Sequence, residues 1–165
     1  MMDERVALIA AEVNALLRER KFMLSTAESC TGGGVAAAIT SCPGSSEIFK
    51  GAVVAYSNEV KSSLLGVSED TLRNFGAVSE ETVREMVAGV SSLMKSDCAI
   101  ATSGIAGPGG GTEDKPVGTV WVAVQVASAV KVTLLQLSDK GRDENIRSTI
   151  VRVLELLREE LLGER

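Results

Sequence analysis

Histidine is absent from the 165 residues of this chain. That absence excludes the Ser-His-Asp triad, the Cys-His dyad and any metal site built on imidazole ligands. Covalent catalysis by a serine or a cysteine in this protein would therefore need lysine, tyrosine, a carboxylate or water as the base.

Aromatic residues and cysteines are also scarce. Aromatic side chains make up 3% of the sequence, so Ala, Val, Leu and Ile must build the core, a composition typical of a layered α/β domain. The length fits one domain that spans residues 1–165. Cys30, Cys42 and Cys98 are odd in number and lack CxxC spacing. We predict reduced thiols rather than a disulfide framework or a zinc site.

Long apolar runs and excess positive charge are lacking as well. No run of about 18 uncharged apolar residues occurs, and the first residues begin a charged helix rather than a signal peptide. We therefore expect a cytoplasmic protein with no membrane partner. The net charge of −5 and the pI near 4.9 oppose broad attraction to a polyanion, although a local basic pocket can still hold one phosphate. The sequence argues against nucleic acid as a partner.

Hydrophobic periodicity predicts alternating helices and strands. Helices with one apolar face are expected at 6–17, 79–95 and 142–162, and shorter ones at 35–39 and after the caps Ser57 and Asn58. Strands are expected at 22–27, 51–56, 99–103, 117–126 and 130–137. The last two strands are predicted to form an antiparallel hairpin. This order predicts an α/β fold, a three-layer α/β/α domain with a central mixed sheet.

Two loops rich in glycine, 28–34 and 104–111, follow predicted strands, where ligands bind in such folds. Ser29 lies between a strand and a glycine-rich helix start. Free N–H groups of Thr31, Gly32 and Gly33 would face an anion or a tetrahedral oxyanion there. Ser29 is therefore a candidate nucleophile; the alternative is that Ser29 or Thr31 only caps the helix. The second loop lacks the lysine of a phosphate-binding P-loop, and a flexible turn is its alternative.

Cys30 is the competing nucleophile, because a thiol near a helix N-terminus can have a lowered pKa. Strand alternation points Ser29 and Cys30 in opposite directions, and we assign the inward position to Cys30. If Ser29 is the nucleophile, Lys61 is the remaining base, with a pKa lowered by burial and nearby cations. Tyr56 precedes it by five residues and would reach the same pocket. On pattern alone, the alternatives are that Lys61 is a solvated surface lysine and that Tyr56 is a packing residue.

Five motifs, in this order, are similar to those of the CinA C-terminal-domain family. They are Ala27–Gly33, Tyr56–Asn58 with Lys61, Gly76–Ser79, Ser103–Pro108 and Lys115–Val120. The resemblance covers nearly the whole chain and is to the stand-alone form, without the larger N-terminal domain of some relatives. The enzymatic members of this family are nicotinamide-nucleotide amidohydrolases, also called NMN deamidases.

The resemblance implies that the chain hydrolyses the carboxamide of nicotinamide mononucleotide to nicotinate mononucleotide and ammonia, in pyridine-nucleotide recycling. It implies no metal and no organic cofactor, and a homo-oligomer. The nucleophile falls on Ser29, the base on Lys61 and an assisting hydroxyl on Tyr56. The alternative is a non-catalytic nucleotide-binding or regulatory module that keeps the same pocket.

The implied substrate pocket combines the two glycine-rich loops with the start of the last helix. Glu28 is the candidate neighbour of the pyridinium ring, with a structural hydrogen bond as its alternative role. Arg142 would grip the phosphate or project into water, and the family's GDR-like segment reads Lys140-Gly141-Arg142 here. The predicted binding residues are Glu28, Thr31, Gly32, Gly33, Thr102, Ser103, Gly104, Gly107 and Arg142.

Overall fold

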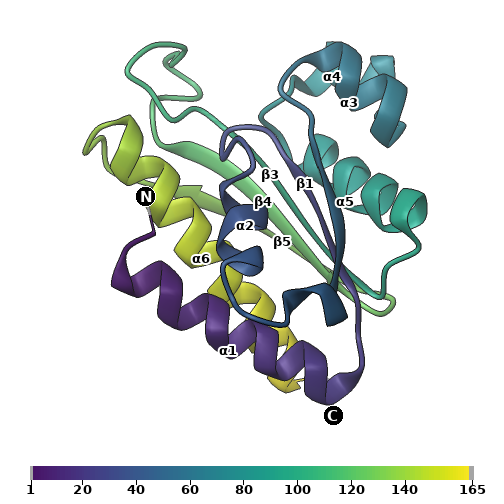
Figure 1. Ribbon diagram of the computed structural model, residues 1–165. Coiled ribbons are helices and arrows are strands. Elements are labelled where there is room, and N and C mark those ends of the chain that lie inside the picture. Colours follow the sequence, from purple (N-terminus) through teal and green to yellow (C-terminus); the bar gives the residue numbers. More distant parts are fainter. Residues whose placement is uncertain (1, 164–165) are drawn as a thin grey trace.

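One five-stranded sheet forms the centre of the structure, a computed structural model that describes residues 2–163 (Figure 1). The strands are β1 (Leu24–Glu28), β2 (Phe49–Val54), β3 (Cys98–Gly104), β4 (Thr119–Val126) and β5 (Ala129–Gln136). Their spatial order is β2-β1-β3-β4-β5. β1 pairs in parallel with β2 and β3, whereas β4 pairs antiparallel with β3 and with β5. The mixed sheet and its C-terminal hairpin are therefore as predicted.

Helices cover both faces of this sheet (Figure 1). The helices α1 (Glu4–Arg20), α2 (Gly34–Thr40) and α6 (Arg142–Gly163) lie on one face. The opposite face carries α3 (Asn58–Leu65), α4 (Glu69–Phe75) and α5 (Glu80–Met94). A single 3₁₀ turn, Ser45–Glu47, precedes β2. The predicted three-layer α/β/α arrangement is confirmed. Within residues 2–163, no helix combines the length and the apolarity needed to cross a bilayer.

Strand alternation divides the apolar interior into two cores. Side chains of α1, α2 and α6 pack with Cys98 and Ile100 of β3 in the first core. Side chains of α5 pack with Ala99 and Ala101 of the same strand in the second core. Successive residues of a strand face opposite sides, so β3 serves both cores. Its fully buried alanines leave room for α5 to approach the sheet closely.

The caps expected from the sequence start two of the helices on the second face. Ser57 accepts a hydrogen bond from Val60 N at 3.2 Å, and Ser79 accepts one from Thr82 N at 3.2 Å. The sequence did not predict α4. Ser68 caps it in the same way, but none of its residues is buried, so it presents no apolar stripe.

The parallel strands β1, β2 and β3 end at the same edge of the sheet. Ser29, Ala55 and Ile105 are the residues that follow them. Ser29 N donates to Thr102 O at 3.0 Å, and Ala55 N donates to Glu28 O at 2.7 Å, so the pairing continues just beyond the strand ends. Loops at such an edge form the usual ligand crevice of open α/β sheets.

Candidate active site

Lys61 and Ser29 meet at this edge. The first turn of α3 begins at the Ser57 cap and carries Lys61, whose N–H donates to Ser57 O. Its Nζ lies 3.2 Å from Ser29 Oγ and 2.9 Å from Ala55 O. The lysine is only 1% exposed, so it is not a solvated surface residue. The structure thus brings together the predicted nucleophile and the predicted base, which are 32 residues apart in sequence.

Burial lowers the pKa of the Lys61 amine below its usual value, because a buried ammonium loses its hydration. The Cys30 thiol nearby opposes this shift. Burial alone therefore accounts for the lowered pKa, without the neighbouring cations that the sequence analysis invoked. A neutral amine beside Ser29 Oγ can accept the serine proton, as a general base requires.

Cys30 lies beside Ser29 but faces the first core, as predicted from strand alternation. It is 7% exposed, and burial raises the pKa of its thiol to about 12. A thiol with this pKa holds very little thiolate at neutral pH, and the thiolate is the reactive form. The environment of Cys30 therefore disfavours it as the nucleophile.

Ser29, Cys30 and Lys61 line a cavity of about 190 Å³. The other lining residues come from four segments: Tyr56 and Asn58, Ala77 and Val78, the strand end with Ser103, Gly104 and Ala106, and Arg142. Ala77, Val78 and Ala106 had no predicted role, and Asn58 was predicted only as a helix cap. Their side chains do not indicate a catalytic role by themselves, although all four residues lie in motifs of the family resemblance.

Ser103 connects two walls of this cavity. Its hydroxyl donates to Ala77 O at 2.8 Å, and the residue is 1% exposed. The hydrogen bond ties the end of β3 to the segment that precedes α5. Ser103 and Gly104, both predicted binding residues, therefore lie at the cavity, whereas Thr102 points to the other face. The hydroxyls of Thr102 and Thr31 lie 2.8 Å apart in a fully buried contact.

Tyr56 and Arg142 meet at the rim of the cavity. The Arg142 Nη2 donates to Tyr56 Oη at 2.8 Å, and its Nη1 donates to Gly107 O at 2.7 Å. Tyr56 is 60% exposed. Among the described residues, Tyr56 forms its side-chain hydrogen bond with Arg142 and not with Ser29 or Lys61. The phosphate contact of Arg142 stays a prediction.

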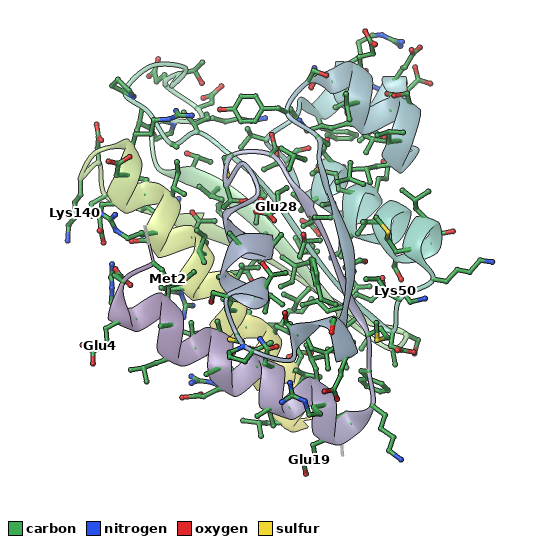
Figure 2. All side chains as sticks on the ribbon, viewed as in Figure 1. Met2, Glu4, Glu19, Glu28, Lys50 and Lys140 are labelled. Carbon is green, nitrogen blue, oxygen red and sulfur yellow. The ribbon has the colours of Figure 1, made fainter. Side chains whose placement is uncertain are left out.

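Glu28 does not reach the cavity. It is fully buried, and Figure 2 places it in the interior, whereas Glu4, Glu19 and Lys140 extend from the surface. Its carboxylate accepts hydrogen bonds from Thr26, Thr31, Val35 N and Ala36 N at 2.7 to 3.1 Å. These bonds occupy both oxygens, so the structure corrects the predicted contact with a pyridinium ring. Glu28 instead anchors the first turn of α2, the structural role that was its alternative.

The loop after Ser29 offers fewer N–H donors than the sequence analysis expects. Gly32 N donates to Ser29 O at 2.9 Å, which removes one of the three predicted donors. Within residues 2–163, the N–H groups of Thr31 and Gly33 have no hydrogen-bond acceptor. These residues line a second cavity, of about 470 Å³, between α1, α2 and α6, rather than the cavity of Ser29 and Lys61.

Known proteins resemble this chain over nearly its whole length. The profile of a family described as the CinA C-terminal domain matches residues 6–161. The CinA-like protein of Endomicrobium trichonymphae is 50% identical over 157 residues, which are 94% of this chain and 36% of that protein. The CinA-like protein of Amoebophilus asiaticus is 46% identical over 152 residues, which are 92% of this chain and 36% of that protein. The chain thus spans just over a third of these curated relatives.

Solved structures share the whole fold. The competence/damage inducible protein CihA from Agrobacterium tumefaciens superposes with a TM-score of 0.93 at 37% identity, over 95% of this chain and 96% of that one. The competence damage-inducible protein A (ComA) from Klebsiella pneumoniae superposes with a TM-score of 0.93 at 35% identity, over 97% and 99%. The α/β architecture described above is therefore the architecture of these proteins too.

Proposed function

This chain belongs to the CinA C-terminal domain family, and from that premise we propose that it hydrolyses the carboxamide of nicotinamide mononucleotide to nicotinate mononucleotide and ammonia. The contact between the buried Lys61 Nζ and Ser29 Oγ, 3.2 Å apart, carries the proposal. A serine without histidine needs another base, and an amine with a lowered pKa supplies one.

In the proposed reaction, Ser29 Oγ attacks the carboxamide carbon while neutral Lys61 takes the serine proton. We assign the oxyanion to backbone N–H donors of the loop that follows Ser29, as the sequence predicts; such donors typically contribute about 3 kcal/mol each. The Lys61 ammonium then protonates the departing nitrogen, and ammonia leaves a nicotinoyl ester on Ser29. Water hydrolyses that ester, with Lys61 as base, and the serine regains its proton.

The size of the cavity suits one part of this substrate. About 190 Å³ is less than the roughly 300–1,000 Å³ of pockets that enclose a drug-sized ligand. We assign the nicotinamide ring to the cavity, and the ribose and the phosphate to the rim. Arg142, the first residue of α6, would there exchange its bond to Tyr56 for the phosphate. Tyr56 Oη, once released, would assist proton transfer to the leaving nitrogen.

Ammonia release from nicotinamide mononucleotide tests the proposal. Wild type, Ser29→Ala and Lys61→Ala are compared after circular dichroism has shown each to be folded. We expect both variants to lose about 10²- to 10⁴-fold or more in kcat/KM. Lys50→Ala is the matched control, since Lys50 is exposed and its Nζ donates to Lys95 O. Wild type that is stabilised by the nucleotide but releases no ammonia would be a non-catalytic binding module.

A further inference from the structure

The loop that begins at Gly104 forms one wall of the Ser29–Lys61 cavity. Its base continues the sheet pairing: Ile105 N donates to Thr119 O at 2.9 Å, and Gly118 N donates to Ile105 O at 2.8 Å. Ala106, the next residue, lines the cavity and is only 6% exposed. From this point the loop leaves the sheet, so other contacts must fix the position of Ala106.

Two side chains from the first turn of α6 supply those contacts. Asn145 Nδ2 donates to Ala106 O at 3.0 Å, and Arg142 Nη1 donates to Gly107 O at 2.7 Å. Residues three apart lie on the same side of a helix, so both side chains reach the loop together. Within residues 2–163, neither carbonyl accepts any other hydrogen bond.

Asn145 differs from Arg142 in its surroundings. It is 2% exposed, does not line the cavity, and contacts the loop on the side away from the cavity. Its own N–H donates to Gly141 O at 3.0 Å, and its carbonyl accepts from Thr149 Oγ1 at 2.8 Å, so the backbone that carries it is held on both sides. A side chain so confined can transmit the position of α6 to the cavity wall.

We propose that Asn145 is a positioning residue for the hydrolysis proposed above, and that it acts by fixing Ala106 as the wall against which the substrate lies. The inference rests on the proposed function. Without Asn145, the Ala106 carbonyl loses the one donor that it has among residues 2–163, and the glycine-rich segment beyond it can shift to find water. The Ser29–Lys61 contact is made by the end of β1 and by α3, so it stays intact.

Asn145→Ala tests the proposal against Asn14→Ala. Asn14 is also 2% exposed on a helix, and its Nδ2 donates to Ala10 O and Ile39 O at 2.9 and 3.2 Å, but it lines neither cavity. Both substitutions are expected to lower Tm. Only Asn145→Ala is expected to lower kcat/KM for nicotinamide mononucleotide, by about 10- to 100-fold, because misplacement of the substrate by about 1 Å costs that much. A kcat/KM within about twofold of that of Asn14→Ala would overturn the proposal.

A small fluorophosphonate probe that labels serine nucleophiles separates the wall from the dyad. Labelling of Ser29 in Asn145→Ala is expected at close to the wild-type rate, because the probe needs only Ser29 and Lys61. A labelling rate that falls as far as kcat/KM would place the effect on the dyad and contradict the proposal. If wild type is labelled by the probe but releases no ammonia, the proposed function is wrong, whereas the proposal for Asn145 is not yet contradicted. The affinity of Asn145→Ala for the nucleotide would then decide: weaker binding supports the proposal and unchanged binding overturns it.

Asn145→Asp tests the donor itself. The ionised aspartate has the same shape but repels Ala106 O, whereas the protonated form can donate to it. Burial raises the pKa of a carboxyl group, so the ratio of kcat/KM in Asn145→Asp to that in wild type is expected to rise as pH falls. A ratio that stays flat while Asn145→Ala loses activity would assign Asn145 a packing role only.

Discussion

Lys61 is held out of water at the first turn of a helix, where the helix dipole also disfavours a positive charge. The same burial that makes the ammonium form unfavourable makes the neutral amine available as a base. Its hydrogen-bond partners are one carbonyl oxygen, Ala55 O, and one hydroxyl oxygen, Ser29 Oγ. The burial of Lys61 should therefore affect both the reaction rate and the stability of the fold, and both can be measured.

The rate should follow the titration of Lys61. The proposed base is the neutral amine, so kcat/KM is expected to rise with pH. The midpoint should lie below the ordinary lysine value of 10.5, since burial lowers the pKa. A pH–rate profile for wild type measures the midpoint. In Lys61→Arg the rise of kcat/KM with pH should disappear, because a guanidinium stays charged. The rate should also fall by about 10²-fold or more. A wild-type profile flat from pH 6 to 10 would contradict the assignment.

The burial of Lys61 should also make the unfolding free energy depend on pH. A lysine whose pKa is lowered by folding is protonated more readily in the unfolded chain, so its burial penalty is complete at low pH. The penalty fades as pH rises from the folded-state pKa towards the unfolded value of about 10.4. Wild type should therefore gain unfolding free energy relative to Lys61→Met over that window. Urea titrations of both proteins at several pH values measure the difference; parallel pH dependences would argue against a titrating buried lysine.

Cys30 should be dispensable for catalysis. Its thiol pKa is raised to about 12 by burial, so we expect Cys30→Ala to keep kcat/KM within about threefold, apart from a cavity cost of about 1–2 kcal/mol in stability. In the same assay Ser29→Ala should be inactive. The opposite pattern, an inactive Cys30→Ala and an active Ser29→Ala, would make Cys30 the nucleophile.

At the level of single residues, the sequence indicates which side chains could react but does not determine their contacts. The missing histidine leaves lysine as a base for Ser29, but the 3.2 Å contact depends on the β1–β2 pairing and on the path of α3. Periodicity does not determine either. For Glu28 the sequence predicts the wrong contact. A carboxylate next to a candidate nucleophile indicates a ligand contact, but in the structure four donors, two of them N–H groups of the first turn of α2, occupy the Glu28 carboxylate. Asn145 carried no signal that separated it from any polar helix residue.

At the level of elements, the placement of α3 depends on one glycine in α5. A Cβ on Gly89 would collide with the carbonyl of Leu65, the last residue of α3. The absence of a side chain at Gly89 therefore allows the two helices to approach closely here. That approach seats the helix that carries Lys61, so Gly89 lies behind the base without touching it.

Gly89→Ala should displace α3. We expect a loss of about 1–3 kcal/mol in unfolding free energy, as for overpacked interiors, and about 10²-fold in kcat/KM, because the base moves relative to Ser29. Urea unfolding and ammonia release measure the two effects. Gly163→Ala is the control, since a Cβ on this helical glycine meets nothing within 4 Å. Full activity in Gly89→Ala would mean that α3 tolerates a shift.

Elements with a long apolar stripe are the ones that the sequence predicts well. The ranges 6–17, 79–95 and 142–162 match α1, α5 and α6, because burial of one helix face leaves a periodic record. The short α4 buries no residue, so its sequence shows no such periodicity. The predicted strands 117–126 and 130–137 leave three residues between them, whereas the hairpin in the structure has a two-residue turn with Ala127 at a positive φ of 54°. An alanine does not signal that conformation, which usually marks glycine or asparagine.

At the level of the whole molecule, the site joins the two cores. Lys61 is carried by α3, which packs on the second core, and Arg142 by α6, which packs on the first. Ser29 and Ser103 come from the strands between them. A ligand in the cavity therefore contacts all three layers, and its binding energy should be shared by the whole domain.

Ligand binding should consequently stabilise both faces together. Ser29→Ala, which can bind the nucleotide without consuming it, should gain about 2.7 kcal/mol at a nucleotide concentration of 100 Kd. Trp121, the one tryptophan of the sequence, packs against the second core and reports on that face by fluorescence, whereas far-UV circular dichroism reports on every helix. For a cooperative domain, the two unfolding curves should coincide and shift equally. If only the fluorescence transition moves, the nucleotide binds on the α3–α5 face alone, and Arg142 on α6 takes no part in binding.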